Sequence, residues 1–168
     1  MNPAGVDSLL QGMAGKLERR LEAEGIERPL VVGIHRGGVW VAERLLEMLA
    51  LEGPLGRLDI GFYRDDFSRI GLDPEVRPSR LPLSIDDRTL ILVDDVIQTG
   101  RTVRAALNAL FDFGRPRRVL LAVLAERGGR ELPIQPDLSG IRAELPATDR
   151  IHLQGPAPLA LHIVRAHP

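Results

Sequence analysis

Cysteine is absent from this sequence of 168 residues. A disulfide framework, a thiolate zinc site and a cysteine nucleophile all need that sulfur, so these classes of structure and chemistry are excluded together. An excess of charge of one sign is also lacking, because the net charge is −1 and the sequence pI is about 6.4. This balance argues against a protein whose whole surface binds nucleic acid.

Long apolar runs are lacking as well. No stretch approaches the roughly 20 apolar residues that cross a bilayer, and the first residues, MNPAGVDSLLQGM, have neither the basic start nor the apolar core of a signal peptide. We therefore expect a cytoplasmic protein with no membrane partner. With 44% apolar and 27% charged residues the chain should fold by itself, and its length predicts a single domain over residues 1–168.

The sequence instead alternates between helical and strand patterns. Leucine or methionine recurs every four residues from residue 9 to residue 21, which predicts an amphipathic helix that ends at Gly25, with Asp7 or Ser8 as its N-cap. Helical patterns also begin near residues 39 and 102. Strands are predicted at residues 30–34, 57–63, 90–95 and 118–125.

Nearly continuous aliphatic strands separated by helices are typical of a parallel sheet with both faces covered. The predicted fold class is therefore α/β, with a parallel β-sheet flanked by helices. Residues from 63 to about 85 contain three prolines and no helical period, which predicts a flexible β-arm or flap. Residues 126–145 become polar and rich in turn formers, and we expect them to form a small C-terminal hood.

Two adjacent carboxylates, Asp94 and Asp95, follow the aliphatic strand LILV and precede the turn Thr99-Gly100-Arg101-Thr102. Ligands of parallel α/β sheets bind beyond the carboxyl ends of the strands. A turn of this kind at a helix N-terminus offers backbone N–H groups to a phosphate, while carboxylates accept hydrogen bonds from hydroxyls and bind hard cations. A ribose 5-phosphate carries hydroxyls next to a phosphate and would match these groups. The alternative is that the aspartates only cap a helix.

The strand, the two acidic residues and the x-x-x-T-G-x-T that follows resemble the phosphoribosyl pyrophosphate (PRPP) signature of type I phosphoribosyltransferases. Three further stretches, YRDD from Tyr63, DDVIQTGRTVRAALNALFDFGRP from Asp94 and RGGRELPIQPD from Arg127, resemble the PyrR family. Members of that family are pyrimidine operon attenuators that are also uracil phosphoribosyltransferases. The resemblance extends from about Val31 to Gly140 and includes the N-terminal helix, but not the stretch after Gly140.

The resemblance implies a role for each motif. Asp94 and Asp95 would be catalytic, holding the ribose hydroxyls and contributing to a Mg²⁺ site mainly through PRPP and water. The catalytic Arg64 would come from the flap, where Arg69, Arg77 and Arg80 are further candidates to meet pyrophosphate. The phosphate of PRPP or UMP would be bound by Ile97, Gln98, Thr99, Gly100, Arg101 and Thr102. The pyrophosphate loop would be His35, Arg36, Gly37 and Gly38, and the hood would read uracil through Arg127, Gly128 and Ile134.

The activity that the resemblance implies is the synthesis of UMP and pyrophosphate from uracil and PRPP with Mg²⁺, linked to pyrimidine salvage and its regulation. It also implies a homodimer or homotetramer, and RNA as a further partner. Gly129, Gln135 and Ile141 stand where the family has His, Arg and Lys, which argues against RNA binding in the family's form.

The turn His35-Arg36-Gly37-Gly38 also departs from the family, whose loop is closer to K-T-R-G, so the arginine stands one place earlier. The differences from the family in this turn and in the hood leave three alternatives open. The turn could be only the tight connection that a strand and a helix need. The protein could be a UMP- or PRPP-sensing regulator with weak or no catalysis that acts through RNA or a protein partner. It could also use a base other than uracil, because the hood differs at Gly129.

Overall fold

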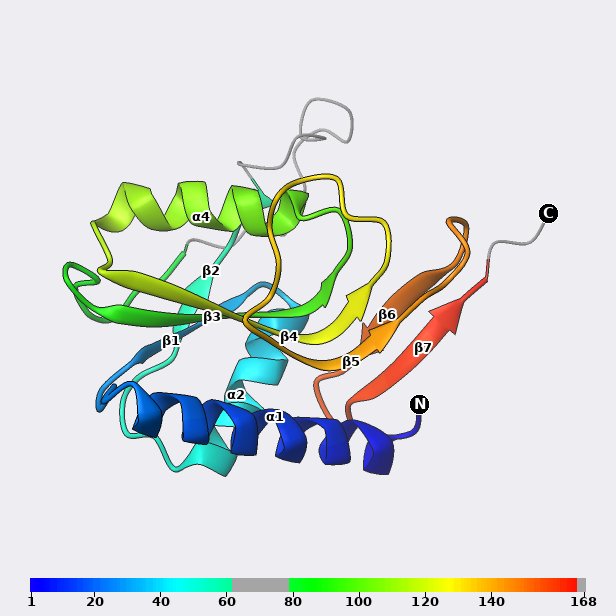
Figure 1. The fold of residues 1–168 in the computed structure, drawn as a ribbon, viewed down its shortest axis with the longest axis horizontal. Coiled ribbons are helices and arrows are strands. Elements are labelled where there is room, and N and C mark those ends of the chain that lie inside the picture. Colours follow the sequence, from blue (N-terminus) through cyan, green and yellow to red (C-terminus); the bar gives the residue numbers. More distant parts are fainter. Residues whose placement is uncertain (62–78, 166–168) are drawn as a thin grey trace.

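The computed structural model describes residues 1–61 and 79–165, and Figure 1 shows their arrangement. Their strands form a parallel sheet in the order β2-β1-β3-β4-β5 and a separate antiparallel pair, β6-β7. The elements are α1 (Pro3–Ala23), β1 (Leu30–Ile34), α2 (Gly37–Leu49), β2 (Gly56–Leu58), β3 (Thr89–Ile97), α4 (Arg101–Phe113), β4 (Arg118–Arg127), β5 (Leu138–Ala143), β6 (Arg150–Gln154) and β7 (Ala160–Val164). The predicted α/β class is confirmed.

Both faces of the sheet are covered, with α1 and α2 on one side and α4 on the other (Figure 1). Successive residues of β3 alternate between the two sides: Ile91 and Val93 pack with α1 and α2, whereas Leu90 and Leu92 pack with α4. All four are fully buried. This double burial explains why the strands are continuous aliphatic runs.

Helix α1 begins earlier than its apolar period indicates. Its N-cap is Asn2, whose side-chain oxygen accepts a hydrogen bond from the backbone N–H of Gly5 at 3.0 Å, and Pro3 occupies the first helical position. The predicted N-cap at Asp7 or Ser8 is therefore wrong, because both residues lie inside the helix. Among the described residues, no helix is long and apolar enough to span a membrane.

Of the strand predicted at residues 57–63, Arg57 and Leu58 pair with β1 as part of β2 (Gly56–Leu58), residues 59–61 belong to no strand, and residues 62 and 63 lie outside the described residues. Arg57 continues the sheet differently, by exchanging two backbone hydrogen bonds with Arg80 at 2.8 and 2.7 Å. Residues 62–78, which contain most of the predicted flap, lie outside the described residues. At the far end of the predicted flap, Ile85 is 1% exposed and packs in the core beneath α4.

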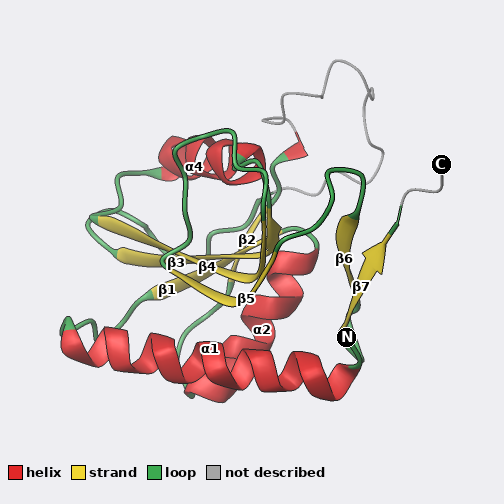
Figure 2. Cartoon of the chain, turned by 45° about the vertical axis from the view of Figure 1, so that its right-hand side comes forward, coloured by secondary structure: helices red, strands yellow, loops and turns green. Residues whose placement is uncertain are grey.

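The last stretch of the chain folds back on its beginning. Strands β6 and β7 pair from Arg150↔Val164 to Gln154↔Ala160, and Leu153 and Leu161 pack into the core with α1. The backbone of Met1 exchanges hydrogen bonds with Leu161, and Figure 2 shows the N-terminus beside this pair of strands. The sequence did not predict this hairpin.

Candidate active site

Three segments meet at the carboxyl edge of the parallel sheet. The turn at residues 35–38 joins β1 to α2, the two aspartates lie near the end of β3, and residues 98–100 join β3 to α4. Strands β1 and β3 are hydrogen-bonded neighbours, paired from Leu30↔Leu90 to Gly33↔Val93. The fold therefore places the predicted pyrophosphate loop, the two carboxylates and the predicted phosphate loop side by side.

Asp94 and Asp95 serve opposite sides of β3. The alternation along the strand turns Asp94 toward the α4 side and Asp95 toward the α2 side. Asp94 is 4% exposed, and its Oδ1 accepts a hydrogen bond from the backbone N–H of Asp95 at 2.9 Å. The N-cap alternative is wrong, because the residue that caps α4 is Gly100 and the residue that caps α2 is Arg36.

The turn before α2 fits closely against β3. A side chain at Gly37 would overlap the Asp95 carboxylate, and one at Gly38 would overlap the backbone of Val93 and Asp94. The His35 N–H donates to the Leu58 carbonyl at 2.9 Å, the His35–Arg36 peptide is cis, and Arg36 is exposed. The two glycines thus let the start of α2 lie directly against the Asp95 carboxylate and the backbone of β3.

The predicted phosphate loop turns into α4 at a glycine with a left-handed backbone. Gly100 has φ of 90° and is the N-cap of α4, whose first backbone bond runs from the Arg104 N–H to the Gly100 carbonyl at 2.9 Å. The Thr99 hydroxyl accepts from the Arg101 N–H at 3.2 Å. Backbone N–H groups in the first turn of a helix have no partner within the helix, so this turn can receive a phosphate.

Part of the predicted hood lies on the phosphate loop. The Thr99 carbonyl accepts hydrogen bonds from the backbone N–H groups of Glu131 and Leu132, at 3.1 and 3.0 Å. A Cβ added at Gly100 would touch the side chains of Leu132 and Ile134, each at 3.4 Å. The structure therefore brings Ile134 to the predicted phosphate loop.

Sequence reasoning missed Glu131 and Leu132, which attach the hood to this loop. Arg101 Nε forms an ion pair with Glu131 Oε2 at 3.0 Å, in addition to the backbone hydrogen bonds. The only signal in the sequence was the opposite charge of these two side chains, and that signal is too common to predict a contact over 30 residues.

The other two hood residues lie differently. Arg127 is 4% exposed, and its Nη2 donates to the Pro146 carbonyl at 2.7 Å, so it binds the connection between β5 and β6. Gly128 lies against the Glu144 carboxylate. Of the flap arginines, Arg64, Arg69 and Arg77 lie outside the described residues, and the backbone of Arg80 pairs with Arg57.

The two carboxylates are the oxygen donors at this edge of the sheet that a magnesium ion would use. Asp94 and Asp95 supply the hard oxygen donors that Mg²⁺ prefers. Within residues 1–61 and 79–165, however, no group of three or more His, Asp or Glu side chains could hold a metal ion. The donor set therefore fits an ion that takes most of its ligands from a phosphorylated substrate and water.

Comparison with known proteins agrees with this arrangement. The family model for the phosphoribosyl transferase domain matches residues 5–153. A protein of Pseudomonas paraeruginosa named "Bifunctional protein PyrR" is 58% identical over 160 residues, which cover 95% of this chain and 92% of the relative. A protein of the same name from Nitrosococcus oceani is 53% identical over 160 residues, covering 94% and 90%.

The match with the first of these relatives corrects the expectation about the stretch after Gly140. A match that covers 95% of the chain includes residues well beyond Gly140, so the last stretch does resemble the relatives.

A hypoxanthine-guanine phosphoribosyltransferase of Bacillus anthracis has a TM-score of 0.68 at 16% identity, over 85% of this chain and 82% of that chain. The hypoxanthine phosphoribosyltransferase of Trypanosoma cruzi has a TM-score of 0.65 at 17% identity, over 88% and 81%. At these identities, the structural likeness shows the fold alone.

Proposed function

Because the chain belongs to the PyrR family of phosphoribosyltransferases, which are glycosyltransferases, we propose that it makes UMP and pyrophosphate from uracil and PRPP. The observation that carries this proposal is the position of Asp94 and Asp95 between two anion-binding turns. One turn starts α2 beside Asp95, and the other starts α4 on the side of Asp94. PRPP carries a phosphate at one end of its ribose and a pyrophosphate at the other. Its site therefore needs an N–H-bearing turn at each end and carboxylates between the two turns.

Each group of the site has a task in this reaction. The turn at Gly100 holds the 5-phosphate through backbone N–H groups, and the Asp94 and Asp95 carboxylates accept hydrogen bonds from the ribose hydroxyls. The turn at Gly37 and Gly38 receives pyrophosphate, which leaves C1 as the ring nitrogen of uracil bonds to it. Positive charge develops on the ribose in this step, and the adjacent carboxylates stabilise it. Bound Mg²⁺ neutralises charge on the pyrophosphate oxygens.

The hood supplies the choice of base in this proposal. Ile134 and Leu132 lie over the phosphate loop and give the base an apolar contact, while the backbone of residues 127–134 offers donors and acceptors. The hydrogen bonds from Glu131 and Leu132 to the Thr99 carbonyl fix the distance between the base-reading and phosphate-binding segments. Fixed spacing of this kind favours one size of nucleotide.

The altered pyrophosphate loop is compatible with turnover. The third position of the turn is Gly37, and a side chain there would collide with Asp95. The loop therefore binds through its backbone in this chain, with the exposed Arg36 next to it. A catalytically silent UMP sensor is the second candidate, and it predicts UMP binding by calorimetry together with no product.

The relatives' name, "Bifunctional protein PyrR", states a second function for those proteins. We propose that this chain likewise couples occupancy of its nucleotide site to the regulation of pyrimidine metabolism, in the cytoplasm and as a homodimer or homotetramer. The proposal does not include RNA binding in the family's form, because Gly129, Gln135 and Ile141 replace three polar or basic residues.

A comparison of bases tests the proposed activity. Pyrophosphate release would be measured with PRPP, Mg²⁺ and, in turn, uracil, orotate, hypoxanthine and guanine. We expect turnover with uracil and at least a hundredfold lower kcat/KM with the other bases, because a site built to hydrogen-bond one base leaves buried polar groups unpaired with another. Equal or faster turnover with a purine or orotate would contradict the assignment of uracil. Absence of turnover with all four, together with UMP binding, would support the sensor.

A further inference from the structure

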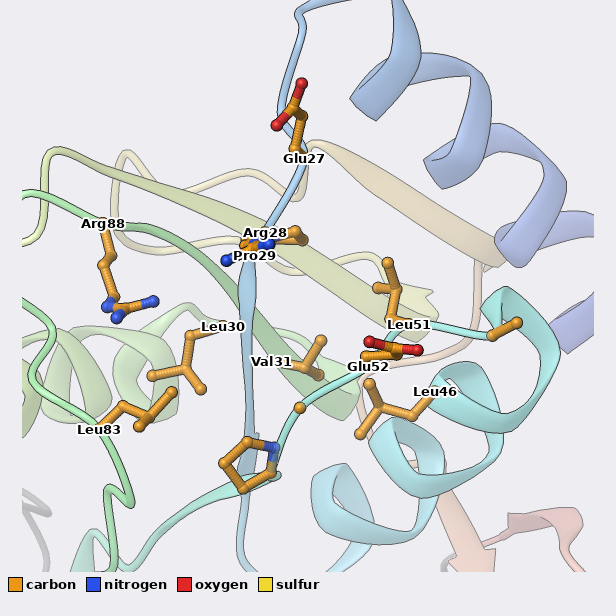
Figure 3. Close-up of a pocket in the computed structure, with 13 residues that line it drawn as sticks. Glu27, Arg28, Pro29, Leu30, Val31, Leu46, Leu51, Glu52, Leu83 and Arg88 are labelled. Atoms are coloured by element: carbon orange, nitrogen blue, oxygen red, sulfur yellow. The ribbon is translucent and has the colours of Figure 1, made fainter.

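A second concave site lies at the opposite end of the sheet from the candidate active site. It has a volume of about 740 Å³, and its lining comes from residues 27–31 at the start of β1, the end of α2, residues 50–54 and the segment before β3. Figure 3 shows this pocket. Its volume falls in the range of about 300–1,000 Å³ that is usual for small-molecule sites.

Part of the lining of the pocket is apolar. Leu30 and Val31, each 3% exposed, lie at its base, and Leu46 and Leu51 line it beside them. Leu83, which is 40% exposed, contributes apolar surface that solvent reaches. Such a surface favours a ligand with an apolar or ring-shaped body.

Two arginines enter the pocket from neighbouring strands. Arg28 lies just before β1 and Arg88 just before β3, and the register Leu30↔Leu90 places these two strand starts next to each other. In Figure 3 the two guanidinium groups lie on the same side of the pocket, near Leu30. Neither guanidinium forms an ion pair with another residue in the described part of the chain.

The two carboxylates in the lining leave this cationic end uncompensated. Figure 3 shows the Glu27 side chain directed away from the arginines, and Glu52 lying near Leu51, apart from them. The pocket thus has two unpaired cations at one end, apolar side chains in part of its lining, and an acceptor at the other end. A tetrahedral dianion can accept hydrogen bonds from both guanidinium groups at once. A pair of guanidinium groups on separate strands therefore suits such a dianion better than it suits a single carboxylate.

We propose that this pocket binds a small organic phosphate, with the phosphate between Arg28 and Arg88 and an apolar or aromatic body over Leu30 and Leu83. The site is separate from the proposed catalytic one. It lies at the starts of β1 and β3, whose other ends carry Gly37 and the two aspartates. The proposal does not depend on which base the enzyme uses.

The test uses the whole chain in solution NMR, with phenyl phosphate and inorganic phosphate as probes. Phenyl phosphate should produce saturable shifts of the backbone amides of Arg28, Leu30, Val31 and residues 83–89. Because the ring adds apolar contact, its affinity at these amides should exceed that of inorganic phosphate by about tenfold. Any shifts of residues 97–102 report the phosphate loop of the candidate active site, so the two sites are read separately.

Variants make the test specific. The double variant Arg28→Gln, Arg88→Gln should reduce the affinity at residues 28–31 and 83–89 by roughly a hundredfold, about tenfold for each charge-assisted contact. Arg19→Gln, which removes an exposed arginine on α1, should leave the affinity unchanged. Shifts confined to residues 97–102, shifts at residues 28–31 and 83–89 that do not saturate, or binding that persists in the double variant would each overturn the proposal.

Discussion

At the scale of single residues, two adjacent carboxylates separate in space because neighbouring residues of a strand face opposite sides of the sheet. Asp94 shares its side with Leu90, Leu92 and α4, whereas Asp95 lies against the Gly37 turn. The pair itself was visible in the sequence, next to a turn that we predict to bind phosphate. The contact with Gly37 was not, since it depends on how closely the end of β1 approaches the end of β3.

Gly37→Ala is the sharpest substitution at this scale. The added methyl group would overlap the Asp95 carboxylate, so the carboxylate or the turn must move. We expect kcat/KM for PRPP to fall about a hundredfold, the usual consequence of displacing a catalytic group by about 1 Å. Steady-state kinetics with varied PRPP measures this effect, and circular dichroism checks that the fold persists.

Gly12→Ala is the matched control. Gly12 lies on the exposed side of α1, and a Cβ there meets no atom within 4 Å. Activity should be unchanged, and the free energy of unfolding should rise by about 0.5–1 kcal/mol because alanine is a better helix former than glycine. If both variants had full activity, the close approach of Gly37 to Asp95 would have no catalytic importance.

At the scale of elements, the hydrophobic period predicted the positions of the helices and buried strands. Where a helix begins depends on its capping residue, which the period does not reveal. The apolar period of α1 begins at Leu9, yet the helix begins at Pro3 because Asn2 caps it. The start of α4 was predicted within one residue, because glycine and threonine mark the turn. The strand predicted from residue 57 does not continue through residues 59–61. Alternation of apolar and polar residues does not reveal that, among the described residues, β1 and β2 pair at only three positions.

Gly100 allows the phosphate loop to turn into α4, so Gly100→Ala should affect both stability and binding. Its φ of 90° is unfavourable for any residue with a Cβ, and that Cβ would press on Leu132 and Ile134. We expect a loss of about 1–2 kcal/mol in the free energy of unfolding and weaker PRPP binding. Urea denaturation and calorimetric titration measure the two effects. Unchanged PRPP affinity would argue against this turn as the phosphate site.

At the scale of the whole molecule, the chain returns to its own beginning. The β6-β7 pair packs Leu153 and Leu161 against α1, and Met1 hydrogen-bonds to Leu161. Sequence reasoning did not find this pairing, because prolines interrupt the stretch and its contacts join residues that are 160 positions apart. Local pattern carries little information about contacts of that separation.

The hairpin should matter for stability rather than for chemistry. Leu153 is 2% exposed, so Leu153→Ala should lower the free energy of unfolding by about 2–4 kcal/mol, the usual cost of a cavity left by a buried leucine. His162→Ala, on the exposed side of the same pair, should change it by less than about 0.5 kcal/mol. Urea unfolding of both variants measures the difference. Equal, small effects would show that the hairpin does not contribute to the core.

The central claim is that the carboxylate pair binds the ribose of PRPP during UMP synthesis. The most direct measurement follows the conversion of uracil and PRPP to UMP with Mg²⁺, for the parent chain and for the double variant Asp94→Asn, Asp95→Asn. We predict UMP formation by the parent and a loss of at least a thousandfold in the folded variant, because amides neither carry the negative charge that stabilises the ribose cation nor bind Mg²⁺ as well. Equal rates for the two proteins would contradict the account, and so would a parent chain that forms no UMP.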